Sequence, residues 1–529
     1  MDTQEHLHHA IAERRTFAII SHPDAGKTTL TEKLLLYSGM IHTAGMVRAR
    51  KGRQSAASDW MAMEQERGIS ITASAMQFTY KDTVINVLDT PGHEDFSEDT
   101  YRTLTAADCA IMVIDAAKGV EKQTRKLFEV CRLSKIPVLT FINKMDMPGR
   151  EPLELMHEVE SVLGIQSFAM NWPIGTGRDF QGVVDRKDGQ CLFFTKVATG
   201  GAQKAEISKG RLEDVKERLG QGGYDALKQD LELLEMAGNS FSLEDFLAGT
   251  VTPVFFASAL TNFGIEPFFD AFIDLAPCPQ ARVVDTNDGN EMRLDPTAPF
   301  SGYVFKLQAN MDRRHRDSMA FLRICSGRFD RDLVVKHHRL GREIRLSRPH
   351  GMVAGERTTL DFAFPGDVIG VINPGLFAIG DTLSLTGGFT FKPLPSFQPE
   401  IFAKVSPADV NKRKAFDKGV VQLTSEGAIQ LFRPYSDMGY SIFGAVGQLQ
   451  FEVMQYRLKD EYGVETTLSP LSYQCSAWLI GDLKTFKKPT NAMLVQDRHD
   501  RPVVLFSNAW EKQYAMKENP DHQLLDMLI

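Results

Sequence analysis

A glycine, a lysine and a threonine stand in a row just after an apolar run, and this order of residue types suits phosphate binding. The stretch SHPDAGKTTL covers residues 21–30 and follows the short run RTFAII. Such a run predicts a buried strand, and the spacing of the leucines after it predicts a helix. A loop between strand and helix points backbone N–H groups at an anion, which the helix dipole also attracts. We therefore interpret residues 21–29 as a phosphate-binding loop.

The loop departs from the usual pattern at its first position, where G-x-x-x-x-G-K-[ST] has glycine and this chain has Ser21. A small side chain can replace that glycine, but the loop by itself is equally compatible with a simple strand-to-helix turn. In a nucleotide site, Gly26 lets the backbone approach phosphate, Lys27 neutralises the β and γ phosphates, and Thr28 offers a hydroxyl to Mg²⁺. The predicted nucleotide contacts in this loop are Ser21, His22, Pro23, Asp24, Ala25, Gly26, Lys27, Thr28 and Thr29.

Three further motifs follow in order, and each ends an apolar run. The first is D-x-x-G, in which the carboxylate of Asp89 can hold Mg²⁺ through water and the N–H of Gly92 can bond a terminal phosphate. The second is N-K-x-D, in which Asp146 can accept hydrogen bonds from two guanine N–H groups that adenine does not present. The third ends at Ser258 and Ala259, where a backbone N–H can meet the guanine carbonyl oxygen. The contacts predicted from these motifs are Asp89, Thr90, Pro91, Gly92, His93, Asn143, Lys144, Asp146, Ser258, Ala259 and Leu260.

The common position of the four motifs decides between a nucleotide site and four unrelated turns. Ligands of open α/β sheets bind at the carboxyl ends of the strands, and all four motifs stand at such ends. Chance does not account for four of them in this order. The sequence therefore predicts a site for GTP or GDP with Mg²⁺.

The segment EQERGISITAS, residues 64–74, together with DTPGHEDF, resembles the translational GTPases. The resemblance implies that a hydroxyl of this switch segment binds Mg²⁺ in the GTP state, with Ser70 at the matching position and Thr72 as the alternative. It also implies that His93 is the catalytic histidine, although a histidine bonded at a helix start is the simpler interpretation of that residue alone. The predicted metal ligands are thus Thr28, Ser70 and Asp89, and the predicted catalytic residues are Lys27, His93, and Pro23 and Ile69, which match the family's apolar gate.

The bulk composition predicts a cytoplasmic protein of several globular domains. The 529 residues are 43% hydrophobic and 24% charged, with six cysteines that form no C-x-x-C pair. The start has no signal peptide, and no apolar run approaches the ~20 residues that span a bilayer. A net charge of −8 argues against non-specific binding to nucleic acid. Residues 311–348 are locally basic, which suits a contact with RNA or a partner as well as it suits solvated strands and turns.

The pattern of elements predicts three folded parts. Residues 1–281 alternate strands and helices, as in an α/β GTPase domain with a mostly parallel sheet, and leave room for an insertion at about 172–247. Residues 282–298 carry proline, glycine and polar residues without periodicity, as a linker does. Residues 299–393 show short alternating strands between turns, which predicts an antiparallel β-barrel. Residues 394–529 mix strands and helices, which predicts an α+β domain.

The strings HPDAGKTTLTEKLLL, DTPGHEDFSEDTYRTLTAADC and FKLQANMDRRHRD make the resemblance closest to the bacterial peptide chain release factor 3 family. The resemblance implies a ribosome-stimulated GTPase that promotes dissociation and recycling of class 1 release factors after peptide release. We expect a monomer whose partners are the ribosome and those factors, and neither DNA nor a membrane. Because no motif covers the ribose 3′ hydroxyl, guanosine tetraphosphate is a candidate competing ligand.

Other GTPases with a similar front end remain as alternatives. Elongation factor G would be expected to continue into a fourth and a fifth domain, which this chain is too short to hold, and a ribosome-protection GTPase is a further alternative. The GTPase subunit of sulfate adenylyltransferase would be expected to end in a second β-barrel, whereas residues 448–465 predict a helix. A GTP-binding scaffold without turnover would not need His93.

Overall fold

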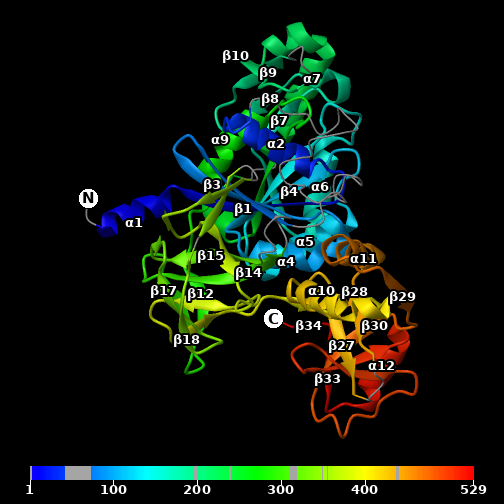
Figure 1. Ribbon diagram of the computed structural model, residues 1–529. Coiled ribbons are helices and arrows are strands. Elements are labelled where there is room, and N and C mark those ends of the chain that lie inside the picture. The colour runs from blue at the N-terminus through cyan, green and yellow to red at the C-terminus, as the bar shows by residue number, and fades with distance from the viewer. Residues whose placement is uncertain are drawn as a thin grey trace.

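The computed structural model describes residues 3–41, 73–195, 201–236, 240–309, 318–347, 349–353, 356–435 and 440–528. Figure 1 shows an α/β region with a β region and a C-terminal region side by side beneath it, and an insertion above. No helix within the described ranges is long and apolar enough to cross a membrane. The predicted architecture, a GTPase domain followed by antiparallel β and α+β parts, is confirmed.

A seven-stranded sheet forms the α/β region, with strand order β2-β3-β1-β4-β5-β11-β6. All neighbours are parallel except β2 and β3. Helices cover both faces, so the central strands are apolar nearly throughout. The strands are β1 (Arg14–Ser21), β2 (Ser74–Tyr80), β3 (Thr83–Asp89), β4 (Cys109–Asp115), β5 (Val138–Asn143), β6 (Gln166–Ala169) and β11 (Val251–Phe256), and the helices are α1 (Thr3–Ala12), α2 (Lys27–Tyr37), α4 (Ser97–Thr105), α5 (Lys122–Leu133), α6 (Pro152–Leu163) and α9 (Ile265–Leu275).

Alternate residues of the central strands serve two separate cores. In β1, Phe17 and Ile19 pack with α2 and α9 on one face of the sheet. Ala18 and Ile20 pack with α4, α5 and α6 on the other face. This alternation follows from the period-2 geometry of a strand, and it fixes which loops reach the carboxyl edge of the sheet.

The insertion forms a four-stranded antiparallel sheet of its own between β6 and β11, in the order β10-β9-β8-β7. Its core is continuous with the α/β region, because Trp172 packs against Phe256 of β11. Trp172 is buried and donates through Nε1 to Asp230 at 3.2 Å. Its elements are β7 (Asn171–Ile174), β8 (Gly182–Asp185), β9 (Cys191–Thr195), β10 (Glu206–Gly210), α7 (Asp214–Met236), which is broken at Gly220, and α8 (Leu243–Leu247).

The segment 282–298, predicted to be a linker from its lack of periodicity, contains a β-hairpin. Its strands β12 (Arg282–Thr286) and β13 (Glu291–Leu294) pair with each other, and β12 also pairs with β24 (Phe389–Phe391). Only Val284 and Leu294 of the two strands are buried apolar residues. Two buried positions in so short a hairpin leave no periodic pattern to detect, which is why sequence analysis did not find the hairpin.

The β region is an eight-stranded antiparallel sheet with the order β18-β17-β23-β14-β15-β22-β19-β20. Its core is apolar and includes Phe300, Leu322 and Ile369. The strands are β14 (Ser301–Ala309), β15 (Ser318–Ser326), β17 (Val334–His337), β18 (Arg342–Arg345), β19 (His350–Val353), β20 (Glu356–Thr359), β22 (Val368–Asn373) and β23 (Thr382–Ser384), with β16 (Phe329–Asp330) and β21 (Phe362–Ala363) forming a separate pair.

The C-terminal region joins a second eight-stranded sheet to three helices, as an α+β domain does. Two cores lie against the helices, one under α10 and α11 and one under α12. The strands are β26 (Ile401–Pro407), β27 (Gln430–Pro434), β28 (Ile442–Ala445), β29 (Thr466–Pro470), β30 (Cys475–Ile480), β31 (Met493–Gln496), β32 (Pro502–Phe506) and β33 (Gln523–Leu525), β25 (Ser396–Phe397) pairs with β34 (Met527–Leu528), and the helices are α10 (Arg413–Ser425), α11 (Gln448–Tyr462) and α12 (Ala509–Glu518).

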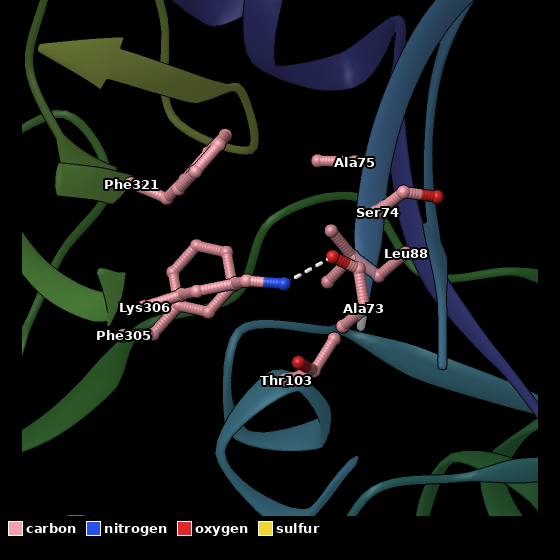
Figure 2. Close-up of a pocket in the computed structure, with 8 residues that line it drawn as sticks. All are labelled: Ala73, Ser74, Ala75, Leu88, Thr103, Phe305, Lys306 and Phe321. Carbon is pink, nitrogen blue, oxygen red and sulfur yellow. Dashed lines mark hydrogen bonds between the residues drawn. The ribbon is translucent and has the colours of Figure 1, made fainter. Parts of the chain in front are cut away.

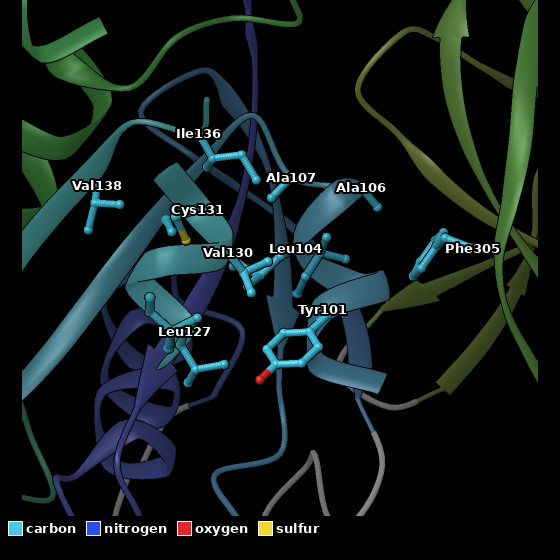
Figure 3. Close-up of a cluster of buried hydrophobic side chains, with 14 of the residues drawn as sticks. Tyr101, Leu104, Ala106, Ala107, Leu127, Val130, Cys131, Ile136, Val138 and Phe305 are labelled. Carbon is cyan, nitrogen blue, oxygen red and sulfur yellow. The ribbon is translucent and has the colours of Figure 1, made fainter. Parts of the chain in front are cut away.

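One core of the GTPase domain continues into the β region. Figure 3 shows Phe305 of β14 beside Tyr101, Leu104 and Ala106 at α4, in the cluster that α5 also lines. An ionic contact lies beside this apolar cluster. The carboxylate of Asp108 pairs with Arg323 of the β region and lies 3.2 Å from Arg282. The two regions therefore share both apolar and ionic contacts.

We predict that Asp108→Ala lowers the free energy of unfolding by about 3–5 kcal/mol, because it leaves the buried Arg323 guanidinium without its carboxylate. Urea denaturation followed by circular dichroism measures the change. The matched control is Asp330→Ala, which removes an exposed carboxylate 2.8 Å from Arg328 and should cost less than about 1 kcal/mol. Equal losses in the two variants would show that the Asp108 contact does not stabilise the interface.

Candidate nucleotide-binding site

The four sequence motifs meet at one edge of the seven-stranded sheet. The parallel register places Ile19 of β1 beside Asp89 of β3, and Phe256 of β11 beside Ile142 of β5. The strands β1, β3, β5 and β11 thus end together at their carboxyl edge. Because a motif follows each of these ends, the phosphate loop and the three later motifs surround one place.

The phosphate loop needs a glycine at position 26 for two reasons. Its backbone has φ 100°, in the left-handed region that favours glycine, and a Cβ there would overlap Nδ2 of Asn143. The next residue, Lys27, begins α2, and neither a side-chain cap nor an acidic residue in the first turn occupies that helix start. The N–H groups of the loop and helix are therefore suited to an anion. Ser21 is buried, as expected for a small residue at the end of β1.

The lysine predicted to bind phosphate contacts the carboxylate of the D-x-x-G motif. Lys27 Nζ lies 2.7 Å from Asp89 Oδ1 and also donates to the carbonyl oxygen of Thr90, and both side chains are buried. The other carboxylate oxygen, Asp89 Oδ2, is buried and has no hydrogen-bond partner in the described part of the chain. A buried carboxylate oxygen without a partner is costly, so it suits a donor such as a Mg²⁺-bound water. The residues present thus fit the predicted metal.

The N-K-x-D motif holds the phosphate loop in place. Asn143 Nδ2 donates to the carbonyl oxygen of Ala25 at 2.8 Å, and Asn143 Oδ1 accepts from the N–H of Ala259 at 2.9 Å. Lys144 Nζ donates to the carbonyl oxygen of Asp24 at 2.7 Å and to Asp115 Oδ2 at 2.7 Å. The side chains of Asn143 and Lys144 thereby join the phosphate loop to the end of β4 and to the residues that follow β11.

The partner of Lys144 was not predicted as a site residue. Burial raises the pKa of the Asp115 carboxyl, but the Lys144 hydrogen bond, the Ala117 N–H and the Lys144 charge together hold that pKa below its usual value. The carboxylate is therefore charged when it holds Lys144. A detectable signal existed, because Asp115 ends the apolar run CAIMVID just as Asp89 ends its own run.

The residues predicted to recognise the base differ in whether their hydrogen-bonding groups are already engaged. Asp146 Oδ1 is buried and has no partner among the described residues, so its acceptor capacity is unused. The N–H of Ser258 bonds Phe263, and that of Ala259 bonds Asn143. The two N–H groups predicted as guanine donors are therefore engaged in this structure, and Leu260, which is half exposed, is the next residue of the loop.

His93 stands at the start of the 3-10 helix η2 (Glu94–Phe96) and is 38% exposed. Its Nδ1 accepts from the N–H of Asp95 at 3.2 Å, which matches the simpler helix-start interpretation. The glycine before it approaches the phosphate loop, since a Cβ on Gly92 would lie 3.6 Å from Pro23 Cα. His93 therefore adjoins the phosphate loop while it is bonded to its own helix.

The predicted switch residues Ile69, Ser70 and Thr72 lie outside the described residues, as does part of the basic segment. The residue that follows them, Ala73, is held from two sides. Its N–H donates to Asp99 Oδ2 at 2.9 Å, and its carbonyl oxygen accepts from Lys306 of the β region. Figure 2 shows this lysine reaching Ala73 across a small pocket between the two regions. No local pattern marks Lys306, so sequence analysis missed it.

Three family models match the chain in the order of its folded parts. Residues 12–278 match the Elongation factor Tu GTP binding domain, residues 299–386 match Elongation factor G domain 2, and residues 391–516 match the C-terminal domain of Class II release factor RF3. Peptide chain release factor 3 of Gloeothece citriformis is 51% identical over 99% of this chain and 97% of its own length. Peptide chain release factor 3 of Synechocystis is 52% identical over 98% of this chain and 95% of its own length. This chain belongs to the peptide chain release factor 3 family.

Membership of the release factor 3 family makes the chain a translational GTPase of termination, a hydrolase with a guanine nucleotide site. A crystal structure of a protein from Thermus thermophilus has the same fold, with a TM-score of 0.69 and 21% identity over 92% of this chain and 72% of that one. The fold class and the activity predicted from the sequence are thus confirmed.

We predict that Asp146→Asn shifts nucleotide preference from guanine toward xanthine, whose exocyclic oxygen needs a donor where guanine needs an acceptor. Each charge-assisted bond lost contributes about 1.5–3 kcal/mol, so the affinity for GDP should fall at least about tenfold. Calorimetry with GDP and xanthosine diphosphate measures both affinities. Asp188→Asn, in the exposed β8–β9 turn of the insertion, is the control and should change neither. An unchanged preference for GDP in Asp146→Asn would refute the base contact.

Proposed function

We propose that this chain binds GTP with Mg²⁺ at the carboxyl edge of its parallel sheet and hydrolyses it on the ribosome to displace class 1 release factors. The observation that carries the proposal is that one chain contains both a GTP binding domain and a release factor C-terminal domain. The unused acceptors Asp89 Oδ2 and Asp146 Oδ1 support it at the two ends of the nucleotide.

In this structure, the groups proposed to bind the phosphates and Mg²⁺ contact each other. Lys27 leaves Asp89 and Thr90 and binds the β and γ phosphates instead. Together with N–H groups of the loop, it neutralises the negative charge on the phosphates as water attacks the γ phosphate. Thr28, Asp89 and a switch hydroxyl of Ser70 or Thr72 would hold Mg²⁺, which supplies further charge neutralisation at the phosphates. The remaining loop residues from Ser21 to Thr29 line the phosphates through their backbone.

The base half of the proposed site distinguishes guanine from adenine. Asp146 accepts from the two guanine N–H groups, and Asn143 and Lys144 hold the phosphate loop against the base loop. Because the Ser258 and Ala259 N–H groups are engaged, we assign the contact with the guanine carbonyl oxygen to the N–H of Leu260. The ribose 3′ hydroxyl has no partner in this scheme, so guanosine tetraphosphate is proposed to compete with GDP.

His93 is proposed to orient the attacking water, with Pro23 and Ile69 as the apolar gate that keeps it away until the ribosome acts. The bond from Asp95 to Nδ1 supports a resting position, because it holds the ring at the start of η2. Hydrolysis without ribosomes should then be slow, at roughly 10⁻⁴ to 10⁻² per second as in unassisted GTPases.

The proposed biological step is thermodynamic. The GTP form shifts the terminating ribosome toward a state that expels the class 1 factor, and it can do so only by its differential affinity for the two states. A difference of about 10⁴-fold would reverse a 1:99 population. Loss of the γ phosphate then relaxes the switch segment and weakens the contact, so the protein leaves. We propose that the protein acts as a monomer in the cytoplasm.

We predict that His93→Ala lowers ribosome-stimulated GTP turnover by about 10²–10⁴-fold, the usual contribution of such a group, and leaves GTP affinity within about twofold. Phosphate release with and without ribosomes, together with calorimetry, separates the two effects. His157→Ala, an exposed histidine of α6, is the control and should behave as wild type. Stimulated turnover that survives in His93→Ala would reject the catalytic assignment.

The termination step itself is tested with labelled class 1 factor on stop-codon ribosomes. The protein with GTP should accelerate dissociation of the factor without cleaving peptidyl-tRNA, and a non-hydrolysable GTP analogue should permit one round of displacement but block turnover. Unchanged dissociation together with accelerated tRNA translocation would instead favour the elongation factor G-like alternative.

A further inference from the structure

The first turn of α11 receives its cap from another region of the chain. The N-cap residue is Gly447, which has no side chain to offer, and the first turn contains no acidic residue. The carboxylate of Asp95, in η2 of the GTPase domain, accepts the N–H of Leu449 through Oδ2 at 2.8 Å. Asp95 is 7% exposed. A buried carboxylate at a helix N-terminus is favoured by both the free N–H groups and the helix dipole.

The glycine at the N-cap makes room for this carboxylate. A Cβ on Gly447 would overlap Oδ1, Cγ and Oδ2 of Asp95. The backbone there is extended, with φ −150° and ψ 173°, so any residue could adopt it. The requirement at position 447 is therefore space for Asp95, and an added methyl group would displace the carboxylate without straining the backbone.

The same aspartate holds the proposed catalytic histidine. The Asp95 N–H donates to His93 Nδ1 at 3.2 Å, and Asp95 Oδ1 lies 3.3 Å from that nitrogen. Asp95 thus contacts His93 through its backbone N–H and its Oδ1, and it contacts Leu449 through its Oδ2. The path from the C-terminal region to His93 is two hydrogen bonds long.

The contact around this path is wider than one hydrogen bond. Glu98, in the first turn of α4 just after η2, accepts from Gln430 at 3.3 Å and from Ser396 at 3.5 Å, and both of those residues belong to the C-terminal region. Figure 1 shows α11 to the side of α4 and α5, at the junction of the two regions. A displacement of the C-terminal region would therefore pull on η2 and α4 together.

We infer that Asp95 is a positioning residue through which the C-terminal region controls His93. While α11 engages Asp95, η2 is held and the His93 ring stays bonded at its start. When the C-terminal region moves away, Asp95 loses Leu449, η2 relaxes and His93 becomes free to orient water. This inference rests on the proposed catalytic role of His93, and it adds the element that restrains that residue.

The direct test is Gly447→Ala, a change in the C-terminal region that does not touch the nucleotide site. GTP turnover of the full-length protein without ribosomes should rise about two- to tenfold, the range expected for loss of one hydrogen bond that restrains the reactive arrangement. Asp95→Ala removes the same contact from the other side and should raise turnover similarly. The double variant should show no further rise, because both changes break one contact.

A second measurement does not depend on activity. Hydrogen exchange should accelerate in peptides covering 93–97 and 448–452 in both variants, since the Leu449 amide loses its acceptor and η2 loses its anchor. Gly222→Ala is the matched control, because its Cβ would meet no heavy atom within 4 Å. It should leave turnover and exchange in both peptides at wild-type values.

The outcomes separate this inference from the proposed function. If His93→Ala abolishes stimulated turnover while Gly447→Ala and Asp95→Ala keep the wild-type rate, the function stands and the inference is overturned. Additive effects in the double variant, or a rate increase that persists in the His93→Ala background, would also overturn it. If His93→Ala retains stimulated turnover, the catalytic role fails, and the inference fails with it.

Discussion

The side-chain amide of Asn143 is the contact on which the shape of the nucleotide site depends. Its Nδ2 holds the phosphate loop at Ala25, and its Oδ1 holds the base loop at Ala259. Asn143 is buried, so losing either bond would leave a polar group unsatisfied, at a cost of about 1–3 kcal/mol. The lack of a side chain at Gly26 lets the amide come this close. The spacing between phosphate and base groups is therefore set before a nucleotide arrives.

Asn143 holds the phosphate loop and the base loop in place, but the groups that would bind the γ phosphate and the metal are engaged with other residues of the protein. Lys27, which would bind the phosphates, contacts Asp89, which would hold Mg²⁺, and the carbonyl oxygen of Thr90. These two charged side chains are therefore paired with each other before a ligand binds. His93 is likewise bonded to its own helix through Asp95. The base side of the site is preformed, whereas the catalytic side is held in contacts that a nucleotide and a partner must exchange. Such an arrangement fits an enzyme that reacts only when assisted.

The convergence of the four motifs could be predicted because its signals are local. Each motif ends an apolar strand, and parallel strands end at one edge, so Asp89, Asn143 and Ser258 had to meet the phosphate loop. The contacts of Asp95 with Leu449 and of Lys306 with Ala73 could not be predicted, because they join residues 354 and 233 positions apart through domain packing. The hairpin within 282–298 was missed for a different reason, since two buried residues leave no period.

The central claim, that these loops form the guanine nucleotide site of a release factor 3 family GTPase, is tested most directly by a structure with Mg²⁺ and a non-hydrolysable GTP analogue. We expect the β and γ phosphates within residues 21–29, Lys27 moved from Asp89 onto them, and Asp146 bonded to the base. A nucleotide bound elsewhere, or a Lys27–Asp89 contact that persists beside bound nucleotide, would contradict the account.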